Sequence, residues 1–236
     1  MVITGSSCIR GTMSLYIEQL SRAGIEVFIE DVSQDVGHLD LKFKVTTIRR
    51  LAQKFSNYKR IVFSDAFDVT FYGTRQDLIH KVPTEYVLWA GEKNCYPDPN
   101  IAPLIPHVGP WRFANGGLLA SSPQKFLEWA DRVEQHPYYK PTMIDQQFHN
   151  MMLSIGSDLC IIDHRTELFF CLFCGYDELQ FENGILRGAE PHQYVGTHVV
   201  PREGFFRMRT QRAHSDQGQT RGRHVFRQWD SPQSAG

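Results

Sequence analysis

The sequence predicts an α/β fold, in which helices flank a mostly parallel, Rossmann-like central sheet. Two patterns lead to this prediction. Short apolar runs alternate along the chain with longer segments whose apolar residues recur every three or four positions, which is typical of strands followed by helices. The run at residues 60–63 is mostly apolar, as in a strand buried on both faces, and two aspartates follow it. A length of 236 residues suits one such domain.

The expected elements follow one another through the first 200 residues. Strands are expected at residues 2–4, 25–29, 60–63, 86–90, 118–120, 159–162, 168–173 and 194–200. Helices are expected at residues 12–23, 45–55, 74–81, 123–135 and 143–153. Thr74 with Asp77 resembles a capping box, and Ser122 before Pro123 is an N-cap followed by a proline at the first helical position. These two signals predict where two of the helices begin.

A long proline-rich loop comes before a pair of glycines. Residues 91–113 have no usable period and hold prolines at positions 97, 99, 103, 106 and 110. A loop of this length in a compact domain is usually functional, and its prolines together with Trp111 favour an ordered lid. Gly116 and Gly117 follow it, and glycines beside a short strand allow the backbone to approach a ligand closely.

Asp65 and Asp68 stand on either side of the aromatic Phe67, just after the strand at residues 60–63. Because aspartate favours turns over strands, both carboxylates should lie past the carboxyl end of that strand, where open α/β sheets bind their ligands. Two hard oxygen donors on one turn suit Mn²⁺ or Mg²⁺, and such an ion would hold a diphosphate. The alternative is that both aspartates only end the strand and cap the segment after it.

The composition argues against a membrane span and against a disulfide framework. The longest apolar run, residues 168–174, is far too short to cross a bilayer. The first residues lack the basic and apolar regions of a signal peptide, so a cytoplasmic protein is expected. The five cysteines show no repeating framework, and the lone pair Cys171 and Cys174 has no second pair, which indicates free, buried thiols.

The end of the chain is basic. Residues 201–236 hold seven arginines and three acidic residues, a net charge of +4 in a chain whose net charge is −1. The sequence predicts a globular domain at residues 1–209 and a basic, flexible C-terminal tail at residues 210–236. A basic tail can contact phosphates, although a basic terminus is more often only solvated.

Four motifs in sequence order carry a family resemblance: IVFSDAFDVTF, WAGEKNCYPDP, FANGGLLA and IDQQ. In this order the sequence resembles, over residues 2–200, the glycosyltransferase domain of the procollagen lysyl hydroxylases and related GT-A enzymes. The resemblance implies a fold of the GT-A type, a UDP-sugar donor, a Mn²⁺ (or Mg²⁺) ion and transfer of a hexose to a hydroxyl group.

The resemblance assigns a metal site to three residues. Asp65 and Asp68 match the acidic motif of the family, and Asp65 also lies on the donor side. The last metal ligand of such enzymes is a late histidine followed by Asn-Gly. His198 is the best match for it, but the Asn-Gly is missing here, so His192 is a rival, as is an ordinary surface histidine.

The resemblance also assigns residues to the donor. Phe67 matches an aromatic residue said to lie against the uracil, and Thr4 would lie at the uridine end of the first strand. Lys44 matches a lysine of the donor-side helix, and Gly116 with Gly117 lies where the backbone would approach the donor.

Two further residues are candidates for catalysis. Asn115 matches the asparagine of an N-x-G-G strand, and Asp145 matches the acidic residue of the D-Q motif. Asp145 is the candidate base for the acceptor hydroxyl if the reaction inverts the anomeric centre. The competing explanation is an aspartate that only favours the helix dipole. Glu92 and Cys95 match the AE…C segment, for which structural roles come first.

Several functions stay open at this point. No iron-binding HxD…H triad is evident, which argues against collagen as the acceptor and favours a stand-alone viral or bacterial enzyme. The acceptor is then a 5-hydroxymethylated base in DNA, for which the arginine-rich C-terminus would have a purpose, or a hydroxylysine-type protein side chain. Alternatives are a metal-dependent nucleotidyltransferase or phosphohydrolase using the same aspartates, and a non-catalytic sugar-nucleotide-binding module.

Overall fold

The computed structural model describes residues 2–6, 11–31, 40–65, 69–71, 73–171, 180–182, 185–187 and 196–198. All of these residues lie in one unit, Met1–Val200. Pro201–Gly236 lie outside the described residues, so the domain boundary at residue 209 and the basic tail stay predictions. No helix in the described ranges is long and apolar enough to cross a membrane.

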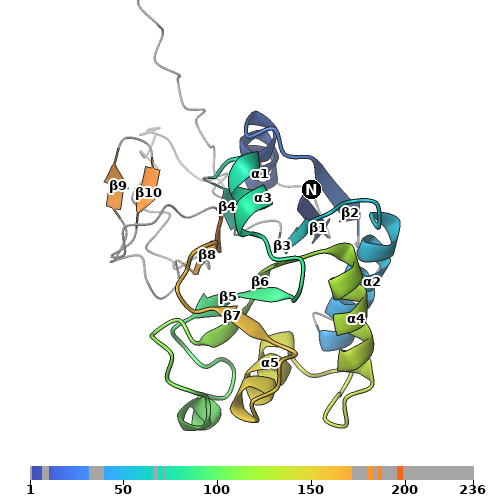
Figure 1. Ribbon diagram of the computed structural model, residues 1–236, viewed down its shortest axis with the longest axis vertical. Helices are drawn as coiled ribbons and strands as arrows, with labels where there is room; N and C mark the ends of the chain where they lie inside the picture. Colours follow the sequence, from blue (N-terminus) through green and yellow to red (C-terminus); the bar gives the residue numbers. More distant parts are fainter. Residues whose placement is uncertain are drawn as a thin grey trace, which may run out of the picture. The chain divides into compact units, whose positions relative to one another are not determined.

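A six-stranded sheet with the order β2-β1-β3-β6-β5-β7 forms the centre of this unit (Figure 1). Its strands are β1 (Val2–Ser6), β2 (Val27–Asp31), β3 (Ile61–Ser64), β5 (Leu88–Glu92), β6 (Phe113–Ser121) and β7 (Ile161–Asp163). Strand β1 pairs in parallel with β2 and β3, and β5 pairs in parallel with β7. Strand β6 runs antiparallel between β3 and β5. The predicted mostly parallel sheet with flanking helices is therefore confirmed.

The described helices are α1 (Gly11–Arg22), α2 (Leu41–Lys54), α3 (Arg75–Lys81), the 3₁₀ helix η2 (Pro99–Leu104), α4 (Pro123–Glu134) and α5 (Asp145–Ser154). At four of them, α2, α3, η2 and α4, a polar side chain caps the first backbone N–H groups. The predicted capping box of Thr74 and Asp77 is present at α3, and the Ser122 hydroxyl caps α4. Asp40 accepts a hydrogen bond from the Phe43 N–H at 2.8 Å, so α2 begins four residues before the predicted position 45.

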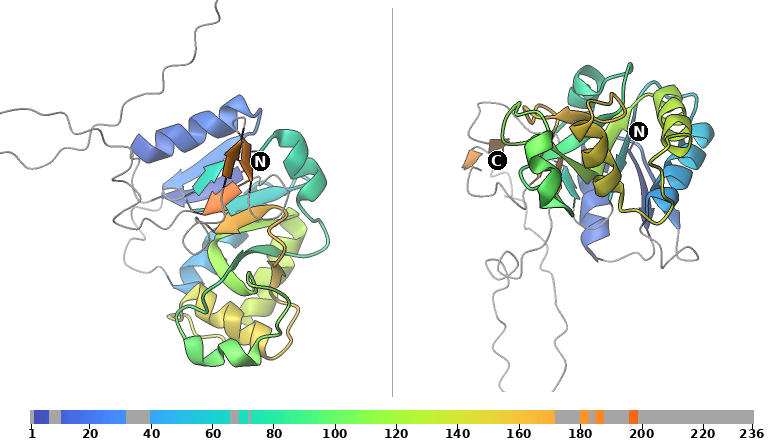
Figure 2. Two further views of the ribbon diagram at one scale, coloured as in Figure 1. Left: turned by 90° about the vertical axis from the view of Figure 1, so that its left-hand side faces the viewer. Right: turned by 90° about the horizontal axis from the view of Figure 1, so that it is seen from below.

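Alternate residues of the central strands point to opposite faces of the sheet, and each face is covered by helices (Figures 1 and 2). Phe63, Trp89 and Leu119 pack on one face with apolar side chains of α2, α4 and α5. On the other face Val62 and Leu118 pack with side chains of α1 and α3. The result is three layers in which β3, β5 and β6 are buried on both sides.

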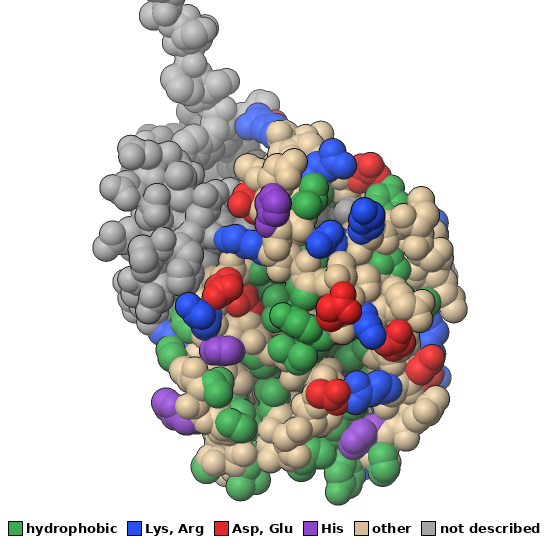
Figure 3. Space-filling view, in the orientation of Figure 1, with side chains coloured by type: hydrophobic (Ala, Val, Ile, Leu, Met, Phe, Trp, Pro, Cys, Tyr) green, Lys and Arg blue, Asp and Glu red, His purple; other side chains and the backbone are tan. Residues whose placement is uncertain are grey.

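A second sheet has the order β4-β11-β8, with β4 at Val69–Phe71, β8 at Phe169–Cys171 and β11 at Gly196–His198. A hairpin joins β9 (Gln180–Glu182) to β10 (Ile185–Arg187). The sequence predicted β8 and β11 but missed β4, β9 and β10, which have three residues each. Acidic and basic side chains are interspersed on the face of the molecule in Figure 3.

Candidate active site

The acidic strand end lies beside the glycine pair. Strand β3 ends at Ser64, which pairs with Leu118 of β6, and the next backbone N–H, that of Asp65, donates to the Gly117 carbonyl at 2.9 Å. Thr4 of β1 follows Ile3, the partner of Phe63, so it lies at the same edge of the sheet. The structure thus places Asp65 at the carboxyl end of a buried strand, as the sequence predicts.

Lys44 and Asp145 meet directly over Gly116. The Lys44 ammonium lies 2.6 Å from Asp145 Oδ2 and donates a hydrogen bond to the Gly116 carbonyl at 2.5 Å. The two side chains are 15% and 12% exposed, so the ion pair is mostly shielded from water. A Cβ atom on residue 116 would lie 2.2 Å from Asp145 Oδ2 and 2.8 Å from Lys44 Nζ. Three residues that the sequence singled out separately therefore form one cluster.

The cluster has a defined charge state at neutral pH. Burial alone would raise the pKa of Asp145, but the neighbouring Lys44 ammonium and hydrogen bonds hold it below its ordinary value. Asp145 is therefore ionised. One helical turn further on, burial lowers the pKa of His149 to about 4, although the Asp145 carbonyl and charge act in the opposite direction. His149 is therefore a neutral imidazole.

Glu92, Asn115 and Gln146 form a buried polar network beside this cluster. Glu92 ends β5 and is 5% exposed, and its Oε2 accepts hydrogen bonds from Asn115 Nδ2 at 3.1 Å and Gln146 Nε2 at 2.9 Å. Gln146 Nε2 also lies 2.8 Å from the Ala114 carbonyl, and Asn115 Oδ1 accepts from the Gly117 N–H at 3.0 Å. The sequence did not mark Gln146 as a site residue, although its place beside Asp145 in the D-Q motif was the available signal.

The second sheet places the backbone of His198 beside β4, the strand that follows the acidic pair in the sequence. Val69, the residue after Asp68, pairs with His198 across β4 and β11, and His198 pairs with Cys171 of β8. Cys171 in turn lies 3.7 Å, Sγ to Nδ2, from Asn115. Backbone pairing therefore connects the strand of His198 to β4 and β8, and a side-chain contact connects β8 to the glycine strand.

Several predicted residues cannot be placed in the same detail. Phe67, Asp68 and His192 lie outside the described residues, and for Thr4 and His198 the structure describes the backbone. Among the described side chains, which do not include those of Asp68 and His198, no three histidine, cysteine, aspartate or glutamate residues group as a metal site would. Cys95 and Cys160 are free and buried, as predicted, and Cys171 is also buried, whereas Cys8 and Cys174 lie outside the described ranges.

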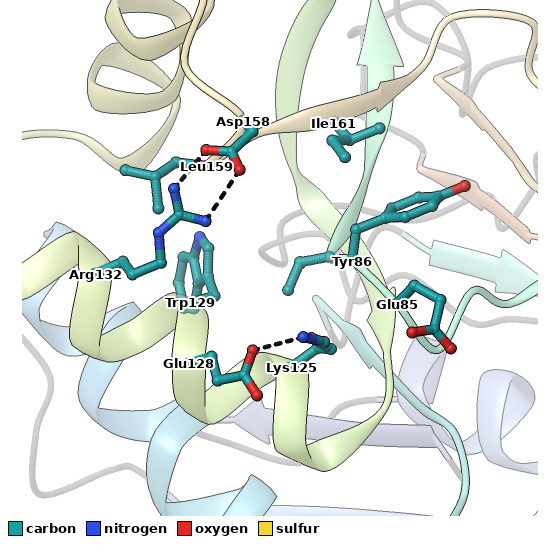
Figure 4. A pocket seen from close by; sticks show the side chains of 10 residues that line it. Glu85, Tyr86, Lys125, Glu128, Trp129, Arg132, Asp158, Leu159 and Ile161 are labelled. Atoms are coloured by element: carbon teal, nitrogen blue, oxygen red, sulfur yellow. Dashed lines mark hydrogen bonds and ion pairs between the residues drawn. The ribbon is translucent and has the colours of Figure 1, made fainter.

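A cavity at the opposite end of β5 is a separate feature (Figure 4). Its walls include Tyr86 and Leu159, which precede β5 and β7, and two ion pairs, Lys125–Glu128 and Arg132–Asp158. Its volume of about 200 Å³ is below the range of roughly 300–1,000 Å³ of typical ligand sites. The cavity is therefore not where a nucleotide sugar would bind.

Fold and site together define a glycosyltransferase of the GT-A type. The family model of the PLOD GT domain matches residues 26–187, which is more than half of the chain. The chain belongs to this family of glycosyltransferase domains, and the resemblance drawn from the four motifs is confirmed.

A solved structure supports the same fold. The chain is similar to the "crystal structure of a glycosyltransferase involved in the glycosylation of the major capsid of PBCV-1", with a TM-score of 0.52 over 84% of this chain and 91% of that one. At 13% sequence identity this likeness concerns the fold alone. No curated protein matches the sequence significantly.

Proposed function

We propose that this glycosyltransferase moves a hexose from a UDP-sugar to an acceptor hydroxyl with the help of Mn²⁺ or Mg²⁺. The observation that carries the proposal is the pairing of Val69 with His198 next to the acidic turn. This pairing supports His198 as a third ligand beside the two aspartates, because β3 ends at Ser64, directly before Asp65, and β11 ends at His198.

The donor set fits a divalent ion. Asp65 and Asp68 would supply carboxylate oxygens. His198, or its rival His192, would supply an imidazole nitrogen. Mn²⁺ and Mg²⁺ accept oxygen-rich sets of this kind. When bound, the ion neutralises the diphosphate leaving group as a Lewis acid.

The nucleotide would lie along the carboxyl edge of β1 and β3. Thr4 in β1 is level with Ser64 in the parallel pairing, so the uridine end of the donor would pass between Thr4 and the acidic turn. Phe67 would stack on the uracil, and Gly116–Gly117 would let the sugar and diphosphate approach the backbone of β6.

Asp145 and Asn115 would act on the sugar and the acceptor. An ionised carboxylate accepts hydrogen bonds from hydroxyl groups, and Lys44 keeps Asp145 ionised. Its low pKa makes Asp145 a weak proton acceptor, which suits orientation of a hydroxyl better than complete proton removal. Asn115, fixed through Glu92 and Gly117, would hold the neighbouring backbone in place.

The loop between β5 and β6 bears on the choice of acceptor. It leaves the site at Glu92 and is anchored by Asn150, whose Nδ2 donates to the Tyr96 carbonyl at 3.0 Å and whose Oδ1 accepts from the Ala114 N–H at 2.8 Å. The side chains of Tyr96, Leu104 and Val108 are each more than half exposed. Residues 94–110 hold one charged residue, Asp98, and no lysine or arginine.

The middle of the loop, residues 94–110, holds no lysine or arginine, and the flanking Lys93 and Arg112 lie over the rings of Trp111 and Phe113. This favours a protein acceptor over DNA, because DNA binding rests on cations that contact phosphates. We therefore place a hydroxylated protein side chain first among the acceptors. The second candidate, a 5-hydroxymethylated base in DNA, is favoured only by the net charge of +4 over residues 201–236.

One labelling experiment tests these proposals together. The protein is incubated with labelled UDP-glucose or UDP-galactose and Mn²⁺, and a hydroxylysine peptide and hydroxymethylated DNA are offered side by side. Label in the peptide, abolished by EDTA, is the expected result. Label in DNA alone would overturn the acceptor order, and transfer that persists in EDTA would overturn the metal. Release of UDP or phosphate at the same rate without any acceptor would favour the phosphohydrolase alternative.

A further inference from the structure

The first turn of α5 carries Asp145 but has no side-chain cap. Ile144 occupies the N-cap position and makes no capping hydrogen bond. The Asp145 carboxylate itself accepts the N–H of the next residue, Gln146, at 2.8 Å. A helix end without a cap frays easily, because its first N–H groups lack intrahelical partners. The place of Asp145 therefore depends on contacts that other residues make with this turn.

His149 makes such a contact from one turn further along the helix. Its Nδ1 lies 2.7 Å from the Asp145 carbonyl, and its Nε2 lies 3.3 Å from Trp129 Nε1 of α4. An indole N–H only donates, so Nε2 must accept and the proton of the neutral ring must be on Nδ1. That proton is then donated to the Asp145 carbonyl. A single tautomer satisfies both hydrogen bonds and ties the start of α5 to α4.

The imidazole ring is held between two tryptophans. Its centroid lies 3.8 Å from the Trp89 ring and 5.7 Å from the Trp129 ring, to which it is stacked at 21°. The side chain of His149 is fully buried. A phenylalanine would fill this space without the cost of burying polar atoms. The polarity of the ring is thus explained by its two hydrogen bonds and not by packing.

We propose that His149 is a positioning residue for the reaction, which holds Asp145 against Lys44 and Gly116 by clamping the uncapped turn of α5. The proposal rests on the proposed role of Asp145 in orienting a hydroxyl. It gives His149 no contact with substrate. Its effect reaches the reaction through the carboxylate, because a displacement of about 1 Å of a group that orients a reactant can lower the rate by about 100-fold.

A matched pair of variants separates positioning from packing. His149→Asn keeps an N–H donor near the position of Nδ1, whereas His149→Gln keeps an acceptor near the position of Nε2 and loses that donor. His149→Phe keeps an aromatic ring but loses both the hydrogen-bond donor and the acceptor. We expect the kcat for transfer from the labelled donor to fall at least tenfold in His149→Phe and His149→Gln. The KM for the UDP-sugar should stay within about twofold, and His149→Asn should recover at least half of the lost activity.

The second measurement uses Asp145→Asn. In that background a further His149→Phe should lower the residual kcat by less than twofold, since the carboxylate through which His149 acts is already gone. Full activity of Asp145→Asn would refute the proposed role of Asp145. If Asp145→Asn loses activity but His149→Gln keeps its kcat, or if the Asn and Gln variants are equally impaired, the positioning role is refuted. If His149→Phe does not fold, the comparison of His149→Asn with His149→Gln still tests the positioning role.

Discussion

Replacing Gly116 by alanine is the most direct test of the cluster of Lys44, Gly116 and Asp145, because the added Cβ atom would occupy the space where the two charged groups meet. The Cβ would lie 2.2 Å from Asp145 Oδ2 and 2.8 Å from Lys44 Nζ, closer than the 3.0 Å below which such contacts essentially do not occur. The carboxylate must therefore move by about 0.8 Å. Movement away from residue 116 also disturbs the Lys44 ammonium, which is bonded to the Gly116 carbonyl.

The size of the effect follows from this displacement and from burial. Misplacing an orienting group by about 1 Å can lower a rate by about 100-fold, so we expect the kcat of Gly116→Ala to fall by 10- to 100-fold, in order of magnitude. Removal of one partner of a buried ion pair costs about 3–5 kcal/mol. Here both partners remain and are only separated, so the free energy of unfolding should fall by less than that.

The assay is transfer of labelled hexose to the acceptor, with the unfolding free energy measured by urea denaturation. Gly24→Ala is the control. Gly24 has a φ of +69° and no atom within 4 Å of a built Cβ. Alanine there strains the backbone by about 1–2 kcal/mol without touching the site, so it should lower stability and leave kcat unchanged. A Gly116→Ala protein with kcat within threefold of the original would show that the Lys44–Asp145 contact has no part in catalysis.

Three further predictions concern the metal ion, the nucleotide and pH. EDTA and Asp68→Asn should each abolish transfer while the melting temperature stays within a few degrees, and full activity in EDTA would contradict the metal site. Phe67→Ala should weaken UDP binding by about 1–3 kcal/mol in calorimetry, the usual worth of stacking on a base, and leave Mn²⁺ affinity unchanged; equal UDP affinity would place Phe67 in the core. Because the pKa of His149 is lowered to about 4, the unfolded chain binds a proton at higher pH than the folded one. The free energy of unfolding should therefore fall by about 3 kcal/mol between pH 7 and pH 4, and this part of the fall should be absent from His149→Phe.

The fold was predictable where apolar periodicity and caps act locally. The buried stripes of α2 and α4 and the caps at Thr74 and Ser122 came from the sequence. Strand β6 was predicted at residues 118–120 but spans nine residues, Phe113–Ser121. Its first half contains Asn115, Gly116 and Gly117, which are poor strand formers. Asn115 pairs with Ala90 of β5, while Gly116 and Gly117 fall where the register shifts between Trp89 and Ala90. Pairing on both sides of this irregularity keeps the segment extended, because tertiary hydrogen bonds outweigh a local preference worth about 1 kcal/mol.

The candidate site was predicted as a set of residues but not as a set of contacts. The family resemblance marked Lys44, Asp145 and the glycines one by one. Their spacing does not predict that Lys44 forms an ion pair with Asp145, which lies 101 positions further along the sequence. His149 was not marked at all. It lies within the helix predicted at residues 143–153, but a histidine there carries no signal until Trp129 is known to face it.

The structure gives Gly116 a role that the sequence did not predict. The sequence marked it for a close approach of the backbone to a ligand, since a missing side chain leaves room for something. In the structure that room is filled by Asp145 and Lys44 of the chain itself. The glycine is therefore required before any donor binds, because it lets two side chains from distant helices meet at the carboxyl edge of β3. A donor that approaches this strand meets an ionised carboxylate already in place.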